Sequence, residues 1–195
     1  MKPYRLLLYA FFFILLSCTS KPEDKVVTPA VNSKTIVKPA INVSGTSYFF
    51  GREFSKETCE AESSCDCCSM LLLFIDGENF VTIYPCESEE TLLRGTYKVT
   101  NGKVVLSYDT LQVDKDYNFE LEGDTIKNDK PEYVVTLKKA KVTSEILESS
   151  SCHGKLYLKA KDDDGIMYGT VDAQYSLNER IQQLKDEGVW DEIQQ

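Results

Sequence analysis

The stretch from Cys59 to Cys86 constrains the fold more than any other part of the sequence. It contains five of the seven cysteines and two apolar runs, 70–75 and 80–84. Asp76-Gly77 lies between the runs, and an Asp-Gly pair in this setting is a strong signal for a β-hairpin. With residues 77 and 78 at the tip, Cys86 lies opposite Ser69 and therefore next to the cysteines at 65, 67 and 68.

The chain from residue 47 onward repeats this pattern of short apolar runs separated by turn signals. Asn101-Gly102, a pair preferred in type I′ hairpin turns, separates the runs 92–100 and 103–108. The remaining strand-like runs are 48–54, 117–122, 133–142, 155–161 and 166–173. About eight to ten short strands with hairpin-length connections predict a mainly β fold, an antiparallel up-and-down β-barrel, which leaves no exposed sheet edge.

The end of the chain changes to a helical period. Ser176-Leu177-Asn178-Glu179 matches a capping box, and apolar residues then recur at helical spacing up to Gly188, a natural C-terminal stop. We predict a C-terminal α-helix over 176–188 that packs on a flank or the mouth of the barrel. Trp190 and Ile193 add a further apolar turn.

The N-terminus has the features of a lipoprotein signal peptide. Lys2 and Arg5 precede an apolar core, 6–16, that is too short for a membrane-spanning helix. The core ends in Leu15-Leu16-Ser17-Cys18, which resembles a bacterial lipobox. The resemblance implies that residues 1–17 are removed and that Cys18 carries the lipid, whose acyl chains anchor a protein stably. An ordinary signal peptide and a membrane anchor are the alternatives.

Residues 18–46 are expected to form the lipidated N-terminus and a flexible linker, and 47–195 the β-barrel domain. As a flexible coil the linker spans roughly 30 Å. No Asp directly follows Cys18, which by resemblance to lipoprotein sorting rules favours the outer membrane. Lys21-Pro22-Glu23-Asp24 resembles a cell-surface export signal, with a solvated start of the linker as the alternative. The periplasmic or cell-surface side therefore stays open.

The composition is acidic. The formal net charge is −9, and it becomes −11 when residues 1–17 are removed with Lys2 and Arg5. This surface argues against nucleic acid as a partner, because nucleic acid is bound by basic patches. It is compatible with a basic protein partner or with cations, and also with the simpler role of keeping the protein soluble.

The sequence offers little for catalysis. His153 is its one histidine, and no nucleophile-elbow, phosphate-loop or dinucleotide-binding motif is present. Asp162-Asp163-Asp164-Gly165 lacks the flanking acids of an EF-hand and is better explained as a hairpin tip. We therefore expect a protein that is not an enzyme and that uses no cofactor.

Six cysteines remain once Cys18 carries a lipid: Cys59, Cys65, Cys67, Cys68, Cys86 and Cys152. An even number in an oxidising envelope favours disulfide bonds, and six cysteines allow fifteen pairings. The hairpin register favours Cys86 with Cys67 or Cys68. Because these two are neighbours and cannot easily pair with each other, the other one is expected to pair with Cys59 or Cys152. Cys65 is expected to pair with whichever cysteine remains.

Cys65-x-x-Cys68 also has the spacing of a metal or redox site. Two thiolates at this spacing suit copper(I) or zinc, with Cys67, Cys86 or His153 completing the shell. A redox dithiol is a further interpretation. It fits less well, because a redox pair usually opens a helix and this pair precedes a predicted strand.

The lipobox, the tether, the C-x-x-C before a hairpin and Gly95-Thr96-Tyr97 resemble the N-terminal barrel of copper-resistance, surface-sensing envelope lipoproteins. The resemblance covers about 47–110 and maps the family's cysteine pair onto Cys65 and Cys68. It implies a small lipocalin-like barrel and a role in copper binding or envelope-stress sensing. Four further cysteines depart from the family's pattern: Cys59, Cys67, Cys86 and Cys152.

Together these features predict a lipid-anchored, non-enzymatic binding protein of the cell envelope. One class of ligand is a small apolar molecule inside the barrel, and the other is a protein partner on an exposed face. Five aromatic residues are expected to point inward: Tyr97, Tyr108, Tyr117, Phe119 and Tyr133. Filling a small core is their alternative role.

Replacing Cys18 with Ala tests the lipid anchor. Because the lipid is attached through the Cys18 sulfur, the variant is expected to accumulate as unprocessed precursor without incorporated lipid. Metabolic labelling with a radioactive fatty acid measures this. A Cys18→Ala protein that is still labelled and cleaved would contradict the anchor.

Overall fold

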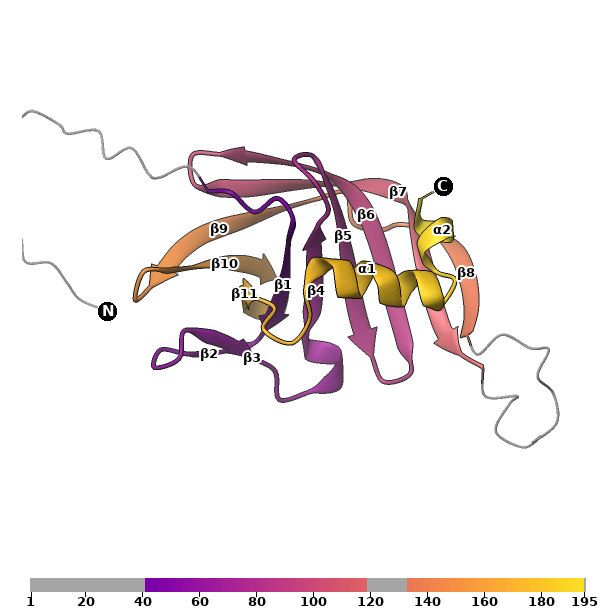
Figure 1. Cartoon of the computed structure of the whole chain (residues 1–195), viewed down its shortest axis with the longest axis horizontal. Coiled ribbons are helices and arrows are strands. Elements are labelled where there is room, and N and C mark those ends of the chain that lie inside the picture. Colours follow the sequence, from indigo (N-terminus) through magenta and orange to yellow (C-terminus); the bar gives the residue numbers. More distant parts are fainter. Residues whose placement is uncertain (1–40, 119–132, 195) are drawn as a thin grey trace, which may run out of the picture. The chain divides into compact units, whose positions relative to one another are not determined.

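A computed structural model describes residues 41–118 and 133–194 of the chain (Figure 1). The predicted lipobox with Cys18, most of the predicted linker and Phe119 lie outside these ranges. The strands in chain order are β1 (Thr46–Gly51), β2 (Glu53–Ser55), β3 (Glu60–Glu62), β4 (Met70–Phe74), β5 (Asn79–Cys86), β6 (Glu89–Thr100), β7 (Lys103–Tyr117), β8 (Tyr133–Lys139), β9 (Ser144–Cys152), β10 (Lys155–Asp162) and β11 (Gly165–Val171). The helices are η1 (Asp66–Cys68), α1 (Leu177–Asp186) and α2 (Trp190–Ile193).

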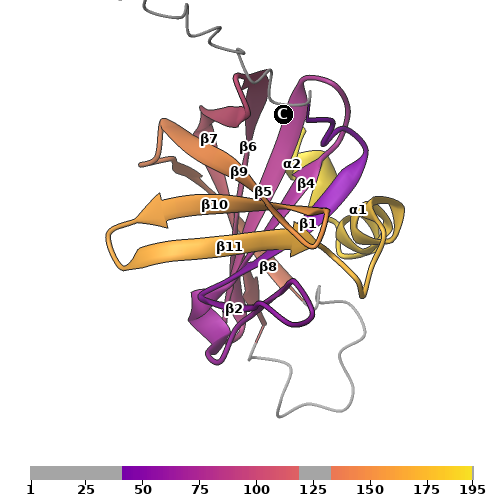
Figure 2. The ribbon, with the colours of Figure 1, turned by 90° about the vertical axis from the view of Figure 1, so that its left-hand side faces the viewer.

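Eight of the strands close into an antiparallel barrel in the order β1-β4-β5-β6-β7-β9-β10-β11. The closing ladder pairs β1 with β11, from Tyr48 opposite Val171 to Gly51 opposite Tyr168. Every strand of the ring lies next to the barrel strand that follows it in the chain (Figure 2). The predicted up-and-down barrel is confirmed.

Three of the described strands, β2, β3 and β8, do not belong to the closed barrel. The hairpin of β2 and β3 is inserted between β1 and β4 and forms its own two-stranded sheet. Strand β8 pairs with the second half of β7, at Leu111–Tyr117. The first part of β7, Lys103–Ser107, pairs with β9. The long strand β7 therefore serves both the barrel and a short extension of its wall.

The barrel interior is filled by apolar and aromatic side chains of alternating strand residues, as a half-buried sheet requires. The buried interior cluster comprises Val43, Tyr48, Phe50, Met70, Leu72, Phe74, Phe80, Leu93, Tyr97, Val104, Leu106, Tyr108, Leu147, Leu158, Ala160 and Met167. Tyr97 and Tyr108 lie inside, as predicted. Tyr117 and Tyr133 do not belong to this cluster, because they lie on the β7–β8 extension and pack against each other there.

The C-terminal helices cover the outer wall of the barrel rather than its mouth. A second buried cluster joins Leu177 and Leu184 of α1 to outward-facing residues of β4, β5, β6 and β7.

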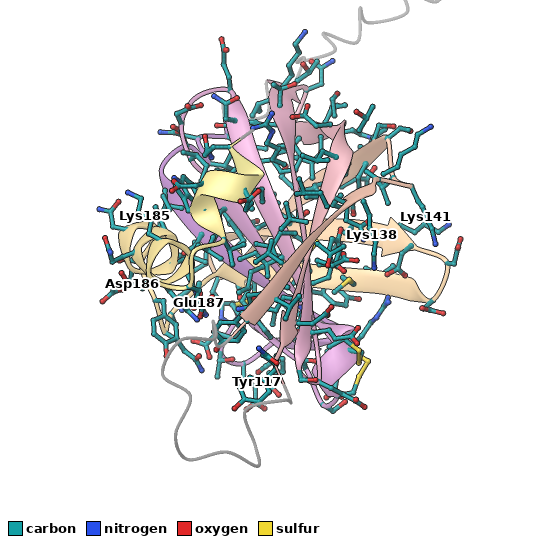
Figure 3. All side chains as sticks on the ribbon, turned by 90° about the vertical axis from the view of Figure 1, so that its right-hand side faces the viewer. Tyr117, Lys138, Lys141, Lys185, Asp186 and Glu187 are labelled. Carbon is teal, nitrogen blue, oxygen red and sulfur yellow. A yellow bond between two sulfur atoms is a disulfide. The ribbon has the colours of Figure 1, made fainter. Side chains whose placement is uncertain are left out.

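Lys115 is buried beneath the end of α1 and forms ion pairs with Glu187 at 2.7 Å and Glu90 at 2.8 Å. Burial lowers the pKa of Lys115, but the hydrogen bonds to these two carboxylates outweigh it and leave the pKa raised. Figure 3 shows Glu187 between α1 and the sheet.

The predicted start and end of the C-terminal helix are both found in the structure. Ser176 caps α1, with its hydroxyl accepting from the Glu179 amide and the Glu179 carboxylate accepting from the Ser176 amide. Helix α1 ends before Gly188, whose φ of 72° is the left-handed value that stops a helix. At the other predicted turn, Asn101 and Gly102 both have positive φ, as type I′ requires.

Several boundaries differ from the expectations. The run 48–54 is broken at Arg52, where the chain leaves the barrel, and the polar strand β9 was not predicted. In the β4–β5 hairpin Leu72 lies opposite Thr82, which shifts the expected register by one residue. The described residues contain no helix that is both long and apolar enough to cross a membrane.

Gly169 tests the packing of the interior. A Cβ at this position would lie 2.3 Å from the Cζ atom of the Phe50 ring, which is fully buried. Gly169→Ala should therefore lower the free energy of unfolding by about 1–3 kcal/mol, the usual cost of overpacking. Urea unfolding measures this. Gly77→Ala is the matched control, because its added methyl meets nothing within 4 Å; equal effects of the two changes would contradict the packing described.

Candidate functional site

Three disulfide bonds connect the six cysteines. Cys59 is bonded to Cys152, Cys65 to Cys68, and Cys67 to Cys86. The expected bond between Cys86 and one of the adjacent cysteines is present. The expectations that the other, Cys68, pairs with Cys59 or Cys152 and that Cys65 takes the remaining cysteine are both wrong. The one-turn helix η1 brings the Cα atoms of Cys65 and Cys68 to 5.3 Å, within disulfide range.

These bonds bear directly on the metal hypothesis. Cys65 and Cys68 are joined to each other, so neither sulfur is a thiolate that could bind copper or zinc. Cys59, Cys152 and His153 also place three possible ligand atoms within 4.8 Å of one another. Two of those atoms are the sulfurs of a disulfide. At either place, metal binding requires the disulfide to be reduced first.

The Cys59–Cys152 bond fixes the β2–β3 hairpin against the outside of the barrel. The bond joins the turn between β2 and β3 to the end of β9, across 93 residues of sequence. At its other end the hairpin lies against Gly51, where an added Cβ would be 2.0 Å from the Glu62 carbonyl oxygen. The Ala61 amide donates to the Thr170 hydroxyl at 3.2 Å. The hairpin is thus held at its tip, its base and its side.

An aromatic stack lies between this hairpin and the barrel wall. Phe54 of β2 stacks on Tyr157 of β10, with ring centroids 4.6 Å apart, and on Tyr168 of β11 at 5.3 Å. All three side chains are half-buried, so they combine an apolar contact with an open side. In Figure 2, where β10 and β11 face the viewer, β2 lies below them on the side of β11.

The stack forms part of a groove of about 710 Å³. Its lining residues are Arg52, Glu53, Phe54, Lys56, Ser151, Cys152, His153, Tyr157, Lys159 and Tyr168. Three of these residues are permanent cations and one is an acid, although the whole chain carries a net charge of −9. The sign of the local charge is therefore opposite to that of the protein.

The cations of the groove differ in how far they are neutralised. Arg52 forms two hydrogen bonds with Asp162, at 2.8 and 2.6 Å, and lies 3.7 Å from Asp164. The hydrogen bond from Arg52 lowers the pKa of Asp162. The Lys159 ammonium lies over the Tyr157 ring at 5.4 Å from its centroid. Lys56 is exposed on the hairpin. Positive charge is thus available from the two lysines rather than from Arg52.

Sequence reasoning did not find this groove. Phe54, Tyr157 and Tyr168 come from two distant parts of the chain, and each has the spacing of an ordinary strand residue. The signal that could have helped is the pairing of Cys59 with Cys152, since it predicts that the segments around these cysteines lie together. The expected pairings, in which Cys59 and Cys152 each bind a cysteine of the 65–68 cluster, exclude this bond, and they are wrong on this point.

A second polar cluster lies inside the barrel. The Tyr108 hydroxyl donates to a Glu145 carboxylate oxygen at 2.8 Å, and the Tyr84 hydroxyl lies 3.5 Å from that of Tyr108. Burial raises the pKa of Glu145 and, together with the neighbouring groups, that of Tyr108. This cluster can hold a proton within the barrel wall, and the Tyr108 ring packs edge-on against Phe80.

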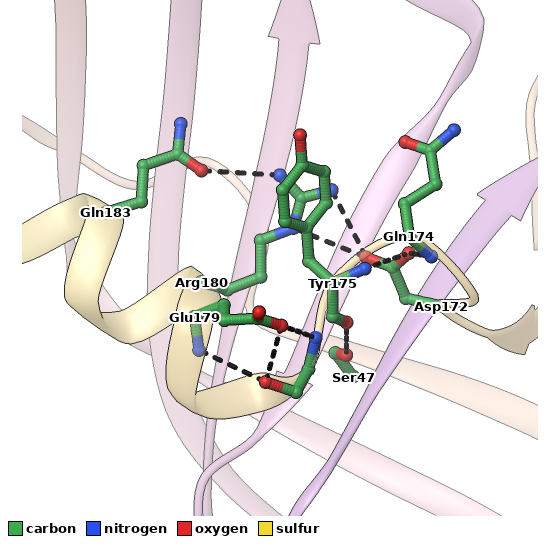
Figure 4. Close-up of polar contacts among 8 residues, drawn as sticks. Ser47, Asp172, Gln174, Tyr175, Glu179, Arg180 and Gln183 are labelled. Carbon is green, nitrogen blue, oxygen red and sulfur yellow. Dashed lines mark hydrogen bonds and ion pairs between the residues drawn. The ribbon is translucent and has the colours of Figure 1, made fainter.

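A smaller cavity of about 430 Å³ lies where α1 begins. Arg180 donates to Asp172 at 3.2 Å, and its guanidinium lies over the Tyr175 ring at 4.0 Å (Figure 4). The Ser47 hydroxyl donates to the Tyr175 carbonyl oxygen. These polar groups are hydrogen-bonded to one another, so the network holds the start of α1 against the barrel. Few of its donors and acceptors are left to bind a ligand.

Comparisons with known proteins concern the fold. No family model matches the chain, and no curated protein matches it. Among solved structures, the chain is similar to a streptavidin-like protein from Bacteroides eggerthii, with a TM-score of 0.54 and 13% sequence identity. The match covers 76% of this chain and 92% of that chain. This likeness agrees with the expected small lipocalin-like barrel.

The disulfide bonds should differ in their effect on stability. In the chain-entropy description, a crosslink contributes more when it closes a longer loop. Replacing Cys59 and Cys152 together by Ala should lower the free energy of unfolding by about 4–5 kcal/mol, and replacing Cys65 and Cys68 by about 2 kcal/mol. Urea unfolding of the two double variants measures the difference. Equal losses would show that loop length does not govern their contributions.

Glu145 should make stability depend on pH. The pKa of Glu145 is higher in the folded protein than in the unfolded chain. Between these two pKa values the folded state keeps a proton that the unfolded state loses, so the free energy of unfolding falls as the pH rises through this range. Glu145→Gln should therefore be more stable than the wild type at about pH 7.5, by less than about 1 kcal/mol because the side chain is only half-buried. The gain should disappear toward about pH 4.

Unfolding by urea at the two pH values measures this effect. Glu78→Gln, at an exposed turn residue, is the control and should show no such pH-dependent gain. A Glu145→Gln protein that is less stable than the wild type at neutral pH would contradict the raised pKa of Glu145.

Proposed function

We propose that this protein is a lipid-anchored, non-enzymatic binding protein of the cell envelope, with its ligand site in the groove beside the β2–β3 hairpin. The observation that carries the proposal is the groove itself: a half-exposed aromatic stack bordered by cations on an acidic protein. Its size falls within the range of small-ligand sites, and a few polar groups surround its apolar part, as in such sites generally.

The groove is a better candidate than the barrel interior. The interior positions of the described strands are occupied by large buried side chains, including Phe50, Leu72 and Phe74. Side chains commonly fill barrels of eight strands, so a ligand there would have to displace packed rings. The groove needs no such rearrangement, because its aromatic residues already have an open side.

The anchor and the location complete the proposal. The lipobox ending at Cys18 supports lipid attachment, and the residues after it favour the outer membrane. The linker would hold the barrel away from the bilayer. An acidic protein is repelled by anionic lipid headgroups, so a tether of this kind keeps the groove accessible.

A basic protein partner is the second candidate, and it is favoured by the net charge of −9. Such a partner would be attracted by the acidic surface outside the groove, and its association would weaken with added salt. Association that does not respond to salt would count against it.

Ligand-dependent stabilisation tests the groove. The mature lipidated protein, held in nanodiscs, is heated with each member of a panel of water-soluble ring compounds, and unfolding is followed by circular dichroism. A ligand of the folded state raises the melting temperature increasingly with its concentration. The expected result is stabilisation that is lost in Tyr157→Leu, which removes a ring of the stack but keeps an apolar side chain.

Tyr175→Leu is the matched control, since this exposed tyrosine lies outside the groove. Stabilisation by the ring compounds should survive this change. A panel without any stabilising compound, or stabilisation unaffected by Tyr157→Leu, would contradict a ligand site at the groove.

A further inference from the structure

We propose that the groove binds an acidic saccharide, a sugar ring that carries a carboxylate. This inference rests on the proposed function and names the chemical class of the ligand at the same site. It comes from three properties of the groove that a single ligand must satisfy together: its aromatic surface, its open side and the sign of its charge.

The aromatic surface calls for a ligand with a flat apolar face. Phe54, Tyr157 and Tyr168 form one continuous stack, with neighbouring ring planes inclined by only 28° and 29° to Phe54. A pyranose ring offers C–H groups on one face, and these can pack against aromatic carbon by dispersion and exclusion of water. An aromatic ligand could use the same surface.

The open side of the groove separates these two kinds of ligand. The three rings are half-buried and line an open groove on the outer wall of the barrel, not its packed interior. An aromatic ligand gains most when both of its faces leave water. A saccharide gains from a one-sided site, because its hydroxyl groups stay hydrated on the open side and need no buried partners.

The charge then selects an anion. Lys56 and Lys159 border the stack, and the imidazole of His153 adds a polar group on the same groove. Arg52 is held by Asp162 and Asp164, so it contributes less. The single acid on the lining, Glu53, is exposed. Two lysines suit the carboxylate of an acidic sugar as point charges at the edge of the ring.

The covalent frame supports a preformed site. The Cys59–Cys152 bond holds the hairpin that carries Phe54 and Lys56 next to the strands that carry Tyr157, Lys159 and Tyr168. Little of the chain then has to become ordered when the ligand binds. A preformed site loses less conformational entropy on binding, which matters most for a shallow site with modest contact area.

Isothermal titration of the mature protein in nanodiscs tests this inference, with trigalacturonate as the acidic probe and maltotriose as its neutral counterpart. Trigalacturonate is expected to bind at least tenfold more tightly than maltotriose, and its affinity should fall as salt is added. Lys56→Gln with Lys159→Gln should weaken trigalacturonate at least tenfold. Lys98→Gln, an exposed lysine on β6, is the matched control and should leave binding unchanged.

Phe54→Leu separates the ring from the charges. It keeps an apolar contact between hairpin and barrel but removes the central ring of the stack, and it should weaken trigalacturonate while the protein remains folded by circular dichroism. Absence of trigalacturonate binding, equal binding of maltotriose, or insensitivity to the two lysines would overturn the acidic-saccharide inference. If an aromatic carboxylate such as 4-hydroxybenzoate binds instead and is lost in Phe54→Leu, the ligand class is wrong but the groove stands.

Discussion

The ladder between β1 and β11 is the constraint on which the rest of this structure depends. It joins the first barrel strand to the last, from Tyr48 opposite Val171 to Gly51 opposite Tyr168. Without it the sheet would have two unpaired edges, at β1 and β11. The barrel would also be open, and the side chains of Tyr48 and Phe50 would no longer be enclosed on all sides by the sheet. Gly169, in the same ladder, leaves room for the Phe50 ring.

The same ladder decides where the inserted hairpin lies. Because β1 is next to β11, the chain that leaves β1 at Arg52 emerges beside β11 and β10, and the β2–β3 hairpin folds over their outer faces. Tyr157 and Tyr168 are thereby brought under Phe54. The Cys59–Cys152 bond then makes this arrangement covalent. The candidate site is thus a consequence of barrel closure, although none of its side chains belongs to the barrel interior.

The sequence predicts well what is encoded locally. Asn101-Gly102 and the Ser176–Glu179 box carry their own geometry, and both are found as expected. The strand β9 was missed because its residues Ser149-Ser150-Ser151 lack the apolar alternation of a strand and owe their pairing to β10. The groove could not be predicted either, because it depends on contacts across about a hundred residues and on one disulfide among fifteen possible pairings.

Disulfide mapping of the purified, unreduced protein tests the arrangement of the hairpin and the groove most directly. Proteolysis without reduction, followed by mass spectrometry, identifies which cysteine peptides are joined. We expect no free thiol among the six cysteines of the domain, and a crosslinked peptide that contains Cys59 and Cys152. A Cys59 or Cys152 that is free or joined to another cysteine would leave the hairpin unfixed and would contradict the groove as described.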